Sequence, residues 1–193
     1  MPLSKIMLDK EFEISDTTIN GEHFYQIRDF FDVEHKEQMI ADVEAYKVEG
    51  SGEYEEVFGN TDFSMEKHPR FQTDIWKKYY DRCLAAVEAA TGKPMKLWTS
   101  WSATAYASDK LENWWHTHKT DIALVYYLQN FEPCHGTVWR PEPGEEIMVM
   151  AHENSISFFT ADWEHDGTFG RWRANEFYKE HPRYVLAAEY NFI

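Results

Sequence analysis

Cysteine is scarce in this chain of 193 residues, which contains only Cys83 and Cys134. Two cysteines cannot form the disulfide network of small secreted domains, so the fold must depend on a hydrophobic core. The sequence also lacks an apolar run of the roughly 18 residues that a membrane span requires. The first residues, Met1 to Lys5, lack the apolar core of a signal peptide. We therefore expect an unexported protein of the reducing cytoplasm, with no membrane partner.

Basic side chains are also few, because 19 lysines and arginines accompany 34 aspartates and glutamates and give a net charge of −15. Such a field repels phosphate backbones and anionic lipid surfaces, so we expect no nucleic acid partner. Aromatic residues are plentiful, at 17% of the chain. They supply core volume and flat walls for a pocket. This composition is typical of a folded protein, and we expect its substrate to be a small molecule or another protein.

The chain has no internal repeat, and its length fits a single domain over residues 1–193. Residues 1 to about 94 are predicted as a support region, with one or two short strands in 14–27. A helix should run from the N-cap Asp32 to about Lys47, and a second from Thr73 or Asp74 to Gly92. From about 95 to 193 turn residues separate short strands, which we expect at 96–106, 115–128, 137–140, 146–152, 155–160 and 183–192. This pattern predicts a mainly β sandwich or barrel braced by N-terminal α-helices.

The pair His116 and His118 is the most informative feature of the sequence. Two imidazoles separated by one residue point the same way on extended backbone, and together they can hold a metal ion. The apolar run at 121–128 predicts a strand buried on both faces, so the pair opens onto a core. A third imidazole, His165, lies where the apolar strand at 155–160 runs into a polar turn. The alternatives are a surface pair at the end of a strand and a solvated histidine in a turn.

Two other side chains bear on this site. Asp121 is a nearby carboxylate, but its odd offset from the histidines puts it on the opposite face of a regular strand, so it would reach the metal only through a bulge. Arg183 opens the last strand, where alternation places it on one face with Val185 and Ala187. An arginine aimed into a barrel needs an anionic partner. The alternative is an arginine at the edge of a strand that points into water.

The order of these parts resembles the 2-oxoglutarate and iron(II)-dependent oxygenases, especially small microbial and phage-type members related to prolyl hydroxylases. The resemblance covers most of the chain from about residue 24. It depends on an amphipathic helix after 24–31, a tyrosine at 106, His116-x-His118 leading into 125–128, a glycine-initiated strand at 136–139, Phe158-Phe159 leading to His165, and a final strand from Arg183.

This resemblance implies a double-stranded β-helix, the cupin-like jelly roll, which holds iron(II) at its mouth. It implies that His116, His118 and His165 are the catalytic metal ligands and that Arg183 pairs with the distal carboxylate of 2-oxoglutarate. Tyr106 would line or hydrogen-bond that cosubstrate, and O2 would be the second one.

Two departures from the family pattern stand out. The second ligand of the family is usually a carboxylate two residues after the first histidine. His118 occupies that place here, so both a three-histidine site and ligation by Asp121 stay open. The interval from His165 to Arg183 is also longer than usual, and Val185 lies where a hydroxyl residue commonly assists the arginine.

The expected activity is therefore hydroxylation of an unidentified protein side chain or small metabolite by a 2-oxoglutarate and iron(II)-dependent dioxygenase. Two alternatives remain: a three-histidine cupin-type metalloenzyme that needs no 2-oxoglutarate, and a non-catalytic jelly-roll interaction protein. Arg183 distinguishes the first alternative, because only an oxo acid needs a cationic partner for its carboxylate. Metal content distinguishes the second.

Overall fold

The computed structural model describes residues 13–19, 21–48, 65–105, 115–129, 137–140, 145–148, 151–167 and 183–193. Its helices are α1 (Val33–Val48), the short 3-10 helices η2 (Met65–Lys67) and η3 (Pro69–Gln72), and α3 (Asp74–Thr91). Its strands are β1 (Ile14–Ile19), β2 (Glu22–Ile27), β3 (Met95–Ala105), β4 (Ile122–Gln129), β5 (Thr137–Arg140), β6 (Ile147–Met148), β7 (Ser155–Thr160), β8 (Glu164–Gly167) and β9 (Arg183–Phe192). No described helix is long and apolar enough to cross a membrane.

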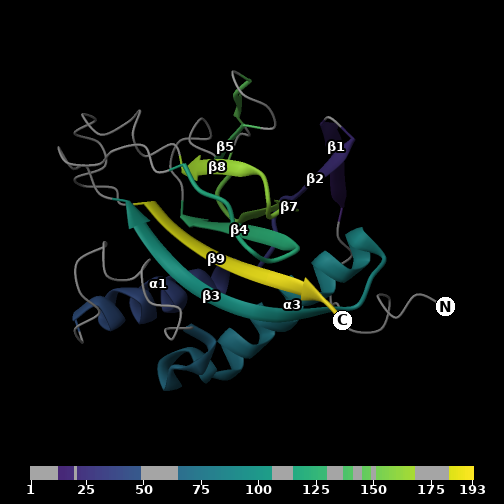
Figure 1. The fold of residues 1–193 in the computed structure, drawn as a ribbon. Coiled ribbons are helices and arrows are strands. Elements are labelled where there is room, and N and C mark those ends of the chain that lie inside the picture. The colour runs from purple at the N-terminus through teal and green to yellow at the C-terminus, as the bar shows by residue number, and fades with distance from the viewer. Residues whose placement is uncertain are drawn as a thin grey trace.

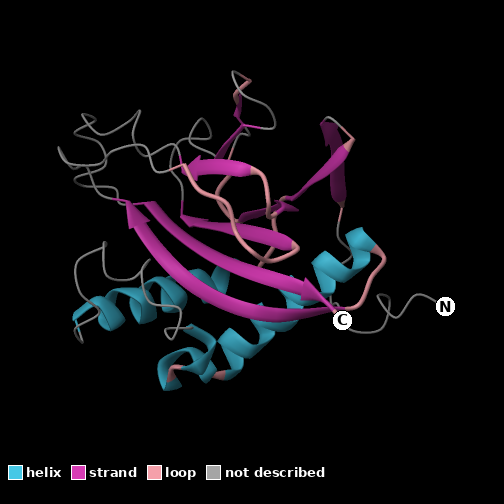
Figure 2. Ribbon diagram, viewed as in Figure 1, coloured by secondary structure: helices cyan, strands magenta, loops and turns pink. Residues whose placement is uncertain are grey.

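The strands form two antiparallel sheets. The larger sheet has the order β1-β2-β7-β4-β9-β3, and the smaller has the order β6-β5-β8. Figure 1 shows α1 and α3 along one face of the larger sheet and the smaller sheet beyond its other face. Figure 2 shows the same separation of helices from strands. This is a jelly roll with bracing helices, which confirms the predicted fold class.

Both long helices begin and end where the local sequence predicts. The Asp32 side chain accepts a hydrogen bond from the Glu34 amide (3.1 Å), as an N-cap does. Helix α3 begins after Thr73 and ends at Gly92, whose left-handed backbone (φ 68°) lets its amide donate to the Glu88 carbonyl. Its buried side chains recur at three-to-four spacing and pack against the larger sheet: Trp76, Tyr79, Cys83, Ala86 and Val87.

Strands β4 and β9 bury both of their faces, and each face has a different neighbour. One face packs in the core under the helices, with Ile122, Leu124, Tyr126, Leu128, Tyr184, Leu186, Ala188 and Tyr190. The other faces the smaller sheet, where Ala123, Phe24 and Phe159 surround Trp139 of β5. A hydrogen bond between the hydroxyls of Tyr127 and Thr137 (2.8 Å) links the two sheets there. This inner face is the one that borders the candidate site.

The structure corrects the sequence predictions in three places. Strand β6 covers only Ile147–Met148 of the strand expected at 146–152, and the described residues 151–152 belong to no strand. The strand expected at 115–128 begins only at Ile122, and of the residues before it His116 alone forms an isolated β-bridge. The polar turn expected around His165 is instead strand β8, because it pairs with β5. Tyr106 and Cys134 lie outside the described residues.

Candidate metal centre

His116 and His165 face each other across a β-bridge. The His116 amide donates to the His165 carbonyl (3.0 Å), and the His165 amide donates to the His116 carbonyl (2.9 Å). His165 also pairs with Trp139 in the smaller sheet. The bridge therefore attaches the segment before β4 to the edge of that sheet.

The same segment then crosses to the larger sheet. The His118 amide donates to the Ala161 carbonyl (2.9 Å), and the Asp121 amide donates to the Tyr190 carbonyl at the end of β9 (3.1 Å). A regular strand cannot change its partner sheet within five residues, which explains why residues 117–121 are not part of a strand. The crossing places His116 and His118 between the edges of the two sheets.

The three histidines singled out in the sequence come together where this segment crosses between the sheets. One ring nitrogen from each of His116, His118 and His165 lies within 4.8 Å of the other two. The ring centroids are 4.4 Å apart for His116 and His165, 4.9 Å for His118 and His165, and 5.0 Å for His116 and His118. Within the described part of the chain, this is the one group of three or more such side chains with the spacing of a metal site.

Hydrogen bonds fix the orientation of two of these rings. Nδ1 of His165 lies 2.8 Å from the Trp163 carbonyl, and Nδ1 of His118 lies 2.9 Å from Oε1 of Glu189. Both partners are acceptors, so the proton of each neutral ring belongs on Nδ1. The two Nε2 atoms, 3.1 Å apart, then face each other with their lone pairs. A cation between them would satisfy both nitrogens.

Burial and hydrogen bonding together set the charge of the two buried groups at this site. His165 is 5% exposed, and this burial lowers its pKa to about 3. His116 and His118 lower the pKa further, and the hydrogen bond that His165 donates to the Trp163 carbonyl only partly opposes them. Burial alone would raise the pKa of Glu189. The hydrogen bond and charge of His118, together with the hydrogen bond from Thr120, outweigh it and lower that pKa. The site therefore combines a neutral imidazole with an ionised carboxylate close by.

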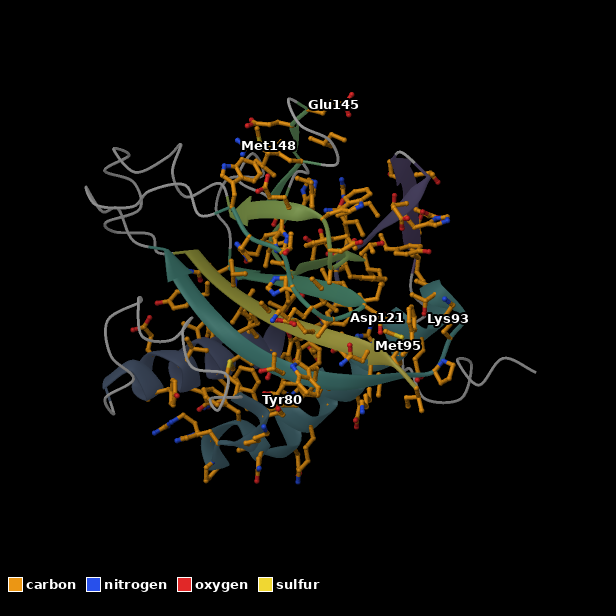
Figure 3. The ribbon with its side chains drawn as sticks, in the orientation of Figure 1. Tyr80, Lys93, Met95, Asp121, Glu145 and Met148 are labelled. Atoms are coloured by element: carbon orange, nitrogen blue, oxygen red, sulfur yellow. The ribbon has the colours of Figure 1, made fainter. Side chains whose placement is uncertain are left out.

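Asp121, the alternative ligand, lies outside the group of three histidines. Its Oδ2 accepts a hydrogen bond from the Phe192 amide (2.8 Å), so the carboxylate caps the end of β9. Figure 3 shows it near Lys93 and Met95, at the end of the sheet next to the C-terminus. Asp121 is therefore engaged at the end of β9 and is not one of the three converging side chains.

The two residues expected at the cosubstrate are described only in part. Arg183 begins β9, where its backbone is paired with Ala105 of β3. Its side chain and all of Tyr106 lie outside the described residues. Further along β9, Val185 packs with Tyr127 and Ala151 between the sheets. The face of β9 that the sequence assigned to Arg183 therefore borders the inter-sheet space.

Sequence reasoning missed Glu189. It lies six residues after Arg183, so alternation places it on the same face as Val185 and Ala187. It is also the one charged residue within the apolar part of this strand, 184–190. A buried carboxylate requires a partner, so this pattern contained the signal.

Comparison with known proteins adds to this geometry. No family model matches the sequence, and no curated protein matches it.

Solved structures do match, and several of them are enzymes. The epimerase SnoN in complex with Fe3+, alpha ketoglutarate and nogalamycin RO is 12% identical, with a TM-score of 0.61 over 88% of this chain and 78% of that chain. A prolyl hydroxylase from Trichoplax adhaerens, in complex with a hypoxia inducible factor peptide, is 14% identical, with a TM-score of 0.59 over 88% and 83%. A prolyl-4-hydroxylase from Pseudomonas putida is 14% identical, with a TM-score of 0.57 over 88% and 88%.

The chain has the fold of the 2-oxoglutarate-dependent oxygenases. This confirms, for the fold, the resemblance that the order of motifs indicated. The identities are low, so the comparison concerns the arrangement of the backbone and not the chemistry of this chain.

The burial of His165 predicts how the stability of the metal-free protein changes with pH. Below about pH 6.5 the unfolded chain protonates this histidine, whereas the folded chain keeps it neutral until about pH 3. Stability is therefore lost as the pH falls through that window. Between about pH 7 and pH 5, the free energy of unfolding should fall by about 2 kcal/mol more in the wild type than in His165→Gln. Urea unfolding of the two metal-free proteins measures this difference, and parallel pH dependences would contradict it.

Proposed function

We propose that this protein is a 2-oxoglutarate- and iron(II)-dependent oxygenase in which His116, His118 and His165 hold the metal. Its reaction would be hydroxylation of a small metabolite or a protein side chain. The observation that carries the proposal is the convergence of three imidazoles between the two sheets, with the Nε2 atoms of His118 and His165 facing each other at 3.1 Å. Solved structures of the same fold include one with Fe3+ and alpha ketoglutarate.

The residues fit such an ion. Ring nitrogens bind metals at about 2.1 Å, so two nitrogens at right angles around one ion lie about 3 Å apart, close to the spacing of these two Nε2 atoms. Three protein ligands on one side of an ion leave positions open for other groups. When bound, iron(II) with 2-oxoglutarate and O2 supplies the oxidising power as the oxo acid is converted to succinate and carbon dioxide.

The chain's own residues would orient the ligands and exclude water. The Phe159 ring lies edge-on to His165, with centroids 4.9 Å apart, and Trp139 packs edge-on against Phe159 at 4.9 Å. This aromatic wall keeps His165 neutral, and the Trp163 carbonyl holds its Nδ1 proton. His165 is therefore a ligand whose ring needs no rearrangement on binding.

For 2-oxoglutarate, we assign the anchor to Arg183, with Tyr106 beside the cosubstrate. Alternation along β9 supports this role, because Val185 packs between the sheets and positions 183 and 187 share its face. The side chains of Val185 and Ala187 are small, as a cosubstrate lying between Arg183 and the histidines requires. Valine at 185 supplies no hydroxyl, so the guanidinium would hold the distal carboxylate without that assistance.

A three-histidine metalloenzyme without an oxo acid is the second candidate. The observation that favours it is His118, an imidazole where the resembling family usually has a carboxylate ligand. Both candidates need the metal, but only the first needs 2-oxoglutarate. Binding of 2-oxoglutarate to the iron-loaded protein separates them.

The first prediction concerns the ligands. His116→Ala, His118→Ala and His165→Ala should each lose most of the bound iron(II), because each change removes one coordinating nitrogen. Asp121→Ala is the matched control and should keep the wild-type iron content. Iron is measured after anaerobic reconstitution and desalting. If His118→Ala keeps its iron while Asp121→Ala loses it, the site has two histidines and one carboxylate.

The second prediction concerns the cosubstrate anchor. Arg183→Ala should weaken 2-oxoglutarate binding by more than about tenfold, because an unpaired buried carboxylate costs on the order of 2 to 5 kcal/mol. Arg183→Lys should restore only part of this loss, since lysine lacks the bidentate fork. Anaerobic titration of 2-oxoglutarate, followed by the visible charge-transfer absorption, gives the affinities.

The iron content of Arg183→Ala should stay unchanged, and the exposed Arg28 provides the control variant Arg28→Ala. Unchanged affinity in Arg183→Ala would move the anchor to another arginine, such as Arg140, Arg171 or Arg173, or remove 2-oxoglutarate from the reaction.

The third prediction tests the reaction. The iron-loaded protein should convert 2-oxoglutarate slowly to succinate under air with ascorbate, even without its substrate, because the metal and cosubstrate residues lie on or beside core strands. His165→Ala should form no succinate above the background without protein. Absence of both succinate and 2-oxoglutarate binding in an iron-loaded protein would favour the three-histidine candidate.

A further inference from the structure

Glu189 is a buried carboxylate in the middle of β9. It is 8% exposed, and its neighbours across the sheet are Ala123 of β4 and Thr99 of β3. Burial of an ionised carboxylate costs several kcal/mol unless it is paired and hydrogen-bonded. Glu189 adds no apolar packing to the core, so its contacts must explain why a carboxylate is buried at this position.

Both oxygens of Glu189 contact the segment that carries the first two histidines. Oε1 lies 2.9 Å from Nδ1 of His118, and Oε2 accepts a hydrogen bond from the Thr120 hydroxyl (2.8 Å). The carboxylate is thus held on both sides by residues two positions apart. It fixes the plane of the His118 ring and keeps the ring proton on Nδ1, so that Nε2 faces His165.

We propose that Glu189 is a positioning residue for the metal ligand His118 and that it supplies, through that ring, the negative charge of the missing carboxylate ligand. This rests on the function proposed above and deepens it. A carboxylate that accepts a hydrogen bond from Nδ1–H makes the imidazole more basic and shifts negative charge toward the Nε2 atom that would bind the ion. Glu189 does not belong to the group of nitrogens that converge, so it acts one ring away from the metal.

The charge at the site supports this reading. Three neutral imidazoles would leave both charges of a divalent ion uncompensated, whereas two histidines and a carboxylate compensate one of them. Glu189 restores one negative charge behind His118, and Thr120 holds it there. We therefore treat two features as a single unit: His118 in the place of a carboxylate ligand, and the buried Glu189 behind it.

The test uses Co(II) as the metal, with affinity read from its visible absorption under anaerobic conditions. Glu189→Gln keeps the volume and an acceptor for the Nδ1 proton but loses the charge, and Glu189→Ala loses both. Removal of such a partner costs about 10- to 100-fold in metal affinity. We expect a loss of about tenfold for Gln and a larger loss for Ala. Glu164→Gln is the matched control, because Glu164 is next to His165 in sequence and its carboxylate lies 3.7 Å from Arg140 instead.

A second measurement separates positioning from a purely structural role. Long-range proton–nitrogen NMR spectra of the metal-free protein, at about pH 8, report which ring nitrogen of His118 carries the proton. Wild type and Glu189→Gln should show it on Nδ1, and Glu189→Ala should show the Nε2 form as well. If Glu189→Ala does not fold, Glu189→Gln alone decides the affinity.

The outcomes are distinguishable. Wild-type affinity within about twofold in both Glu189 variants would overturn this inference and leave the three-histidine site intact. An equal loss in Glu164→Gln would show a general effect of charge and would also overturn it. Failure of the wild-type protein to bind Co(II) would instead overturn the proposed function itself.

Discussion

Strict alternation along β4 and β9 is the constraint on which the rest of this structure depends. Each strand lies inside the larger sheet and is covered on both faces, so every residue must suit one of two different neighbours. Tyr184, Leu186, Ala188 and Tyr190 face the helices, whereas Val185 and Glu189 face the smaller sheet or the histidines. A shift of one residue would move Glu189 into the apolar core and Tyr190 into the site. The site can therefore exist in one register only.

Much of this fold was predictable because its signals are local. The bounds of α1 and α3 follow from Asp32 and Gly92, and the strands at 137–140, 155–160 and 183–192 lie where turn residues and apolar runs place them. Strand β8 was not predictable in this way, because Glu164, His165 and Asp166 are polar and belong to a strand only through pairing with β5 and His116. The strand predicted between His116 and β4 was wrong for a related reason, since the backbone partners of these residues come from two different sheets.

The candidate site was predictable to about the same extent as the fold. The spacing of His116 and His118, and the position of His165 after an apolar strand, were enough to propose that the three meet. Their orientations were not predictable, because they depend on the Trp163 carbonyl and on Glu189, which is 71 residues from His118. Contacts over such an interval leave no periodic pattern at the residue that makes them. The sequence does show a charged residue inside an apolar strand. Such a residue indicates that a partner exists, but it does not identify that partner.

The charge of the whole chain gives the site a further property. The net charge of −15 opposes the approach of a dianion such as 2-oxoglutarate, and the ionised Glu189 adds a negative charge beside the histidines. On the proposed assignment, the bound metal is the local positive charge that reverses this repulsion. On that assignment, the compensating carboxylate of Glu189 would lie behind His118, on the Nδ1 side of the ring and away from an incoming ligand. On the same assignment, the metal would be in place before the oxo acid binds, and Arg183 would hold the distal carboxylate, which adds affinity and fixes which end of the oxo acid reaches the metal.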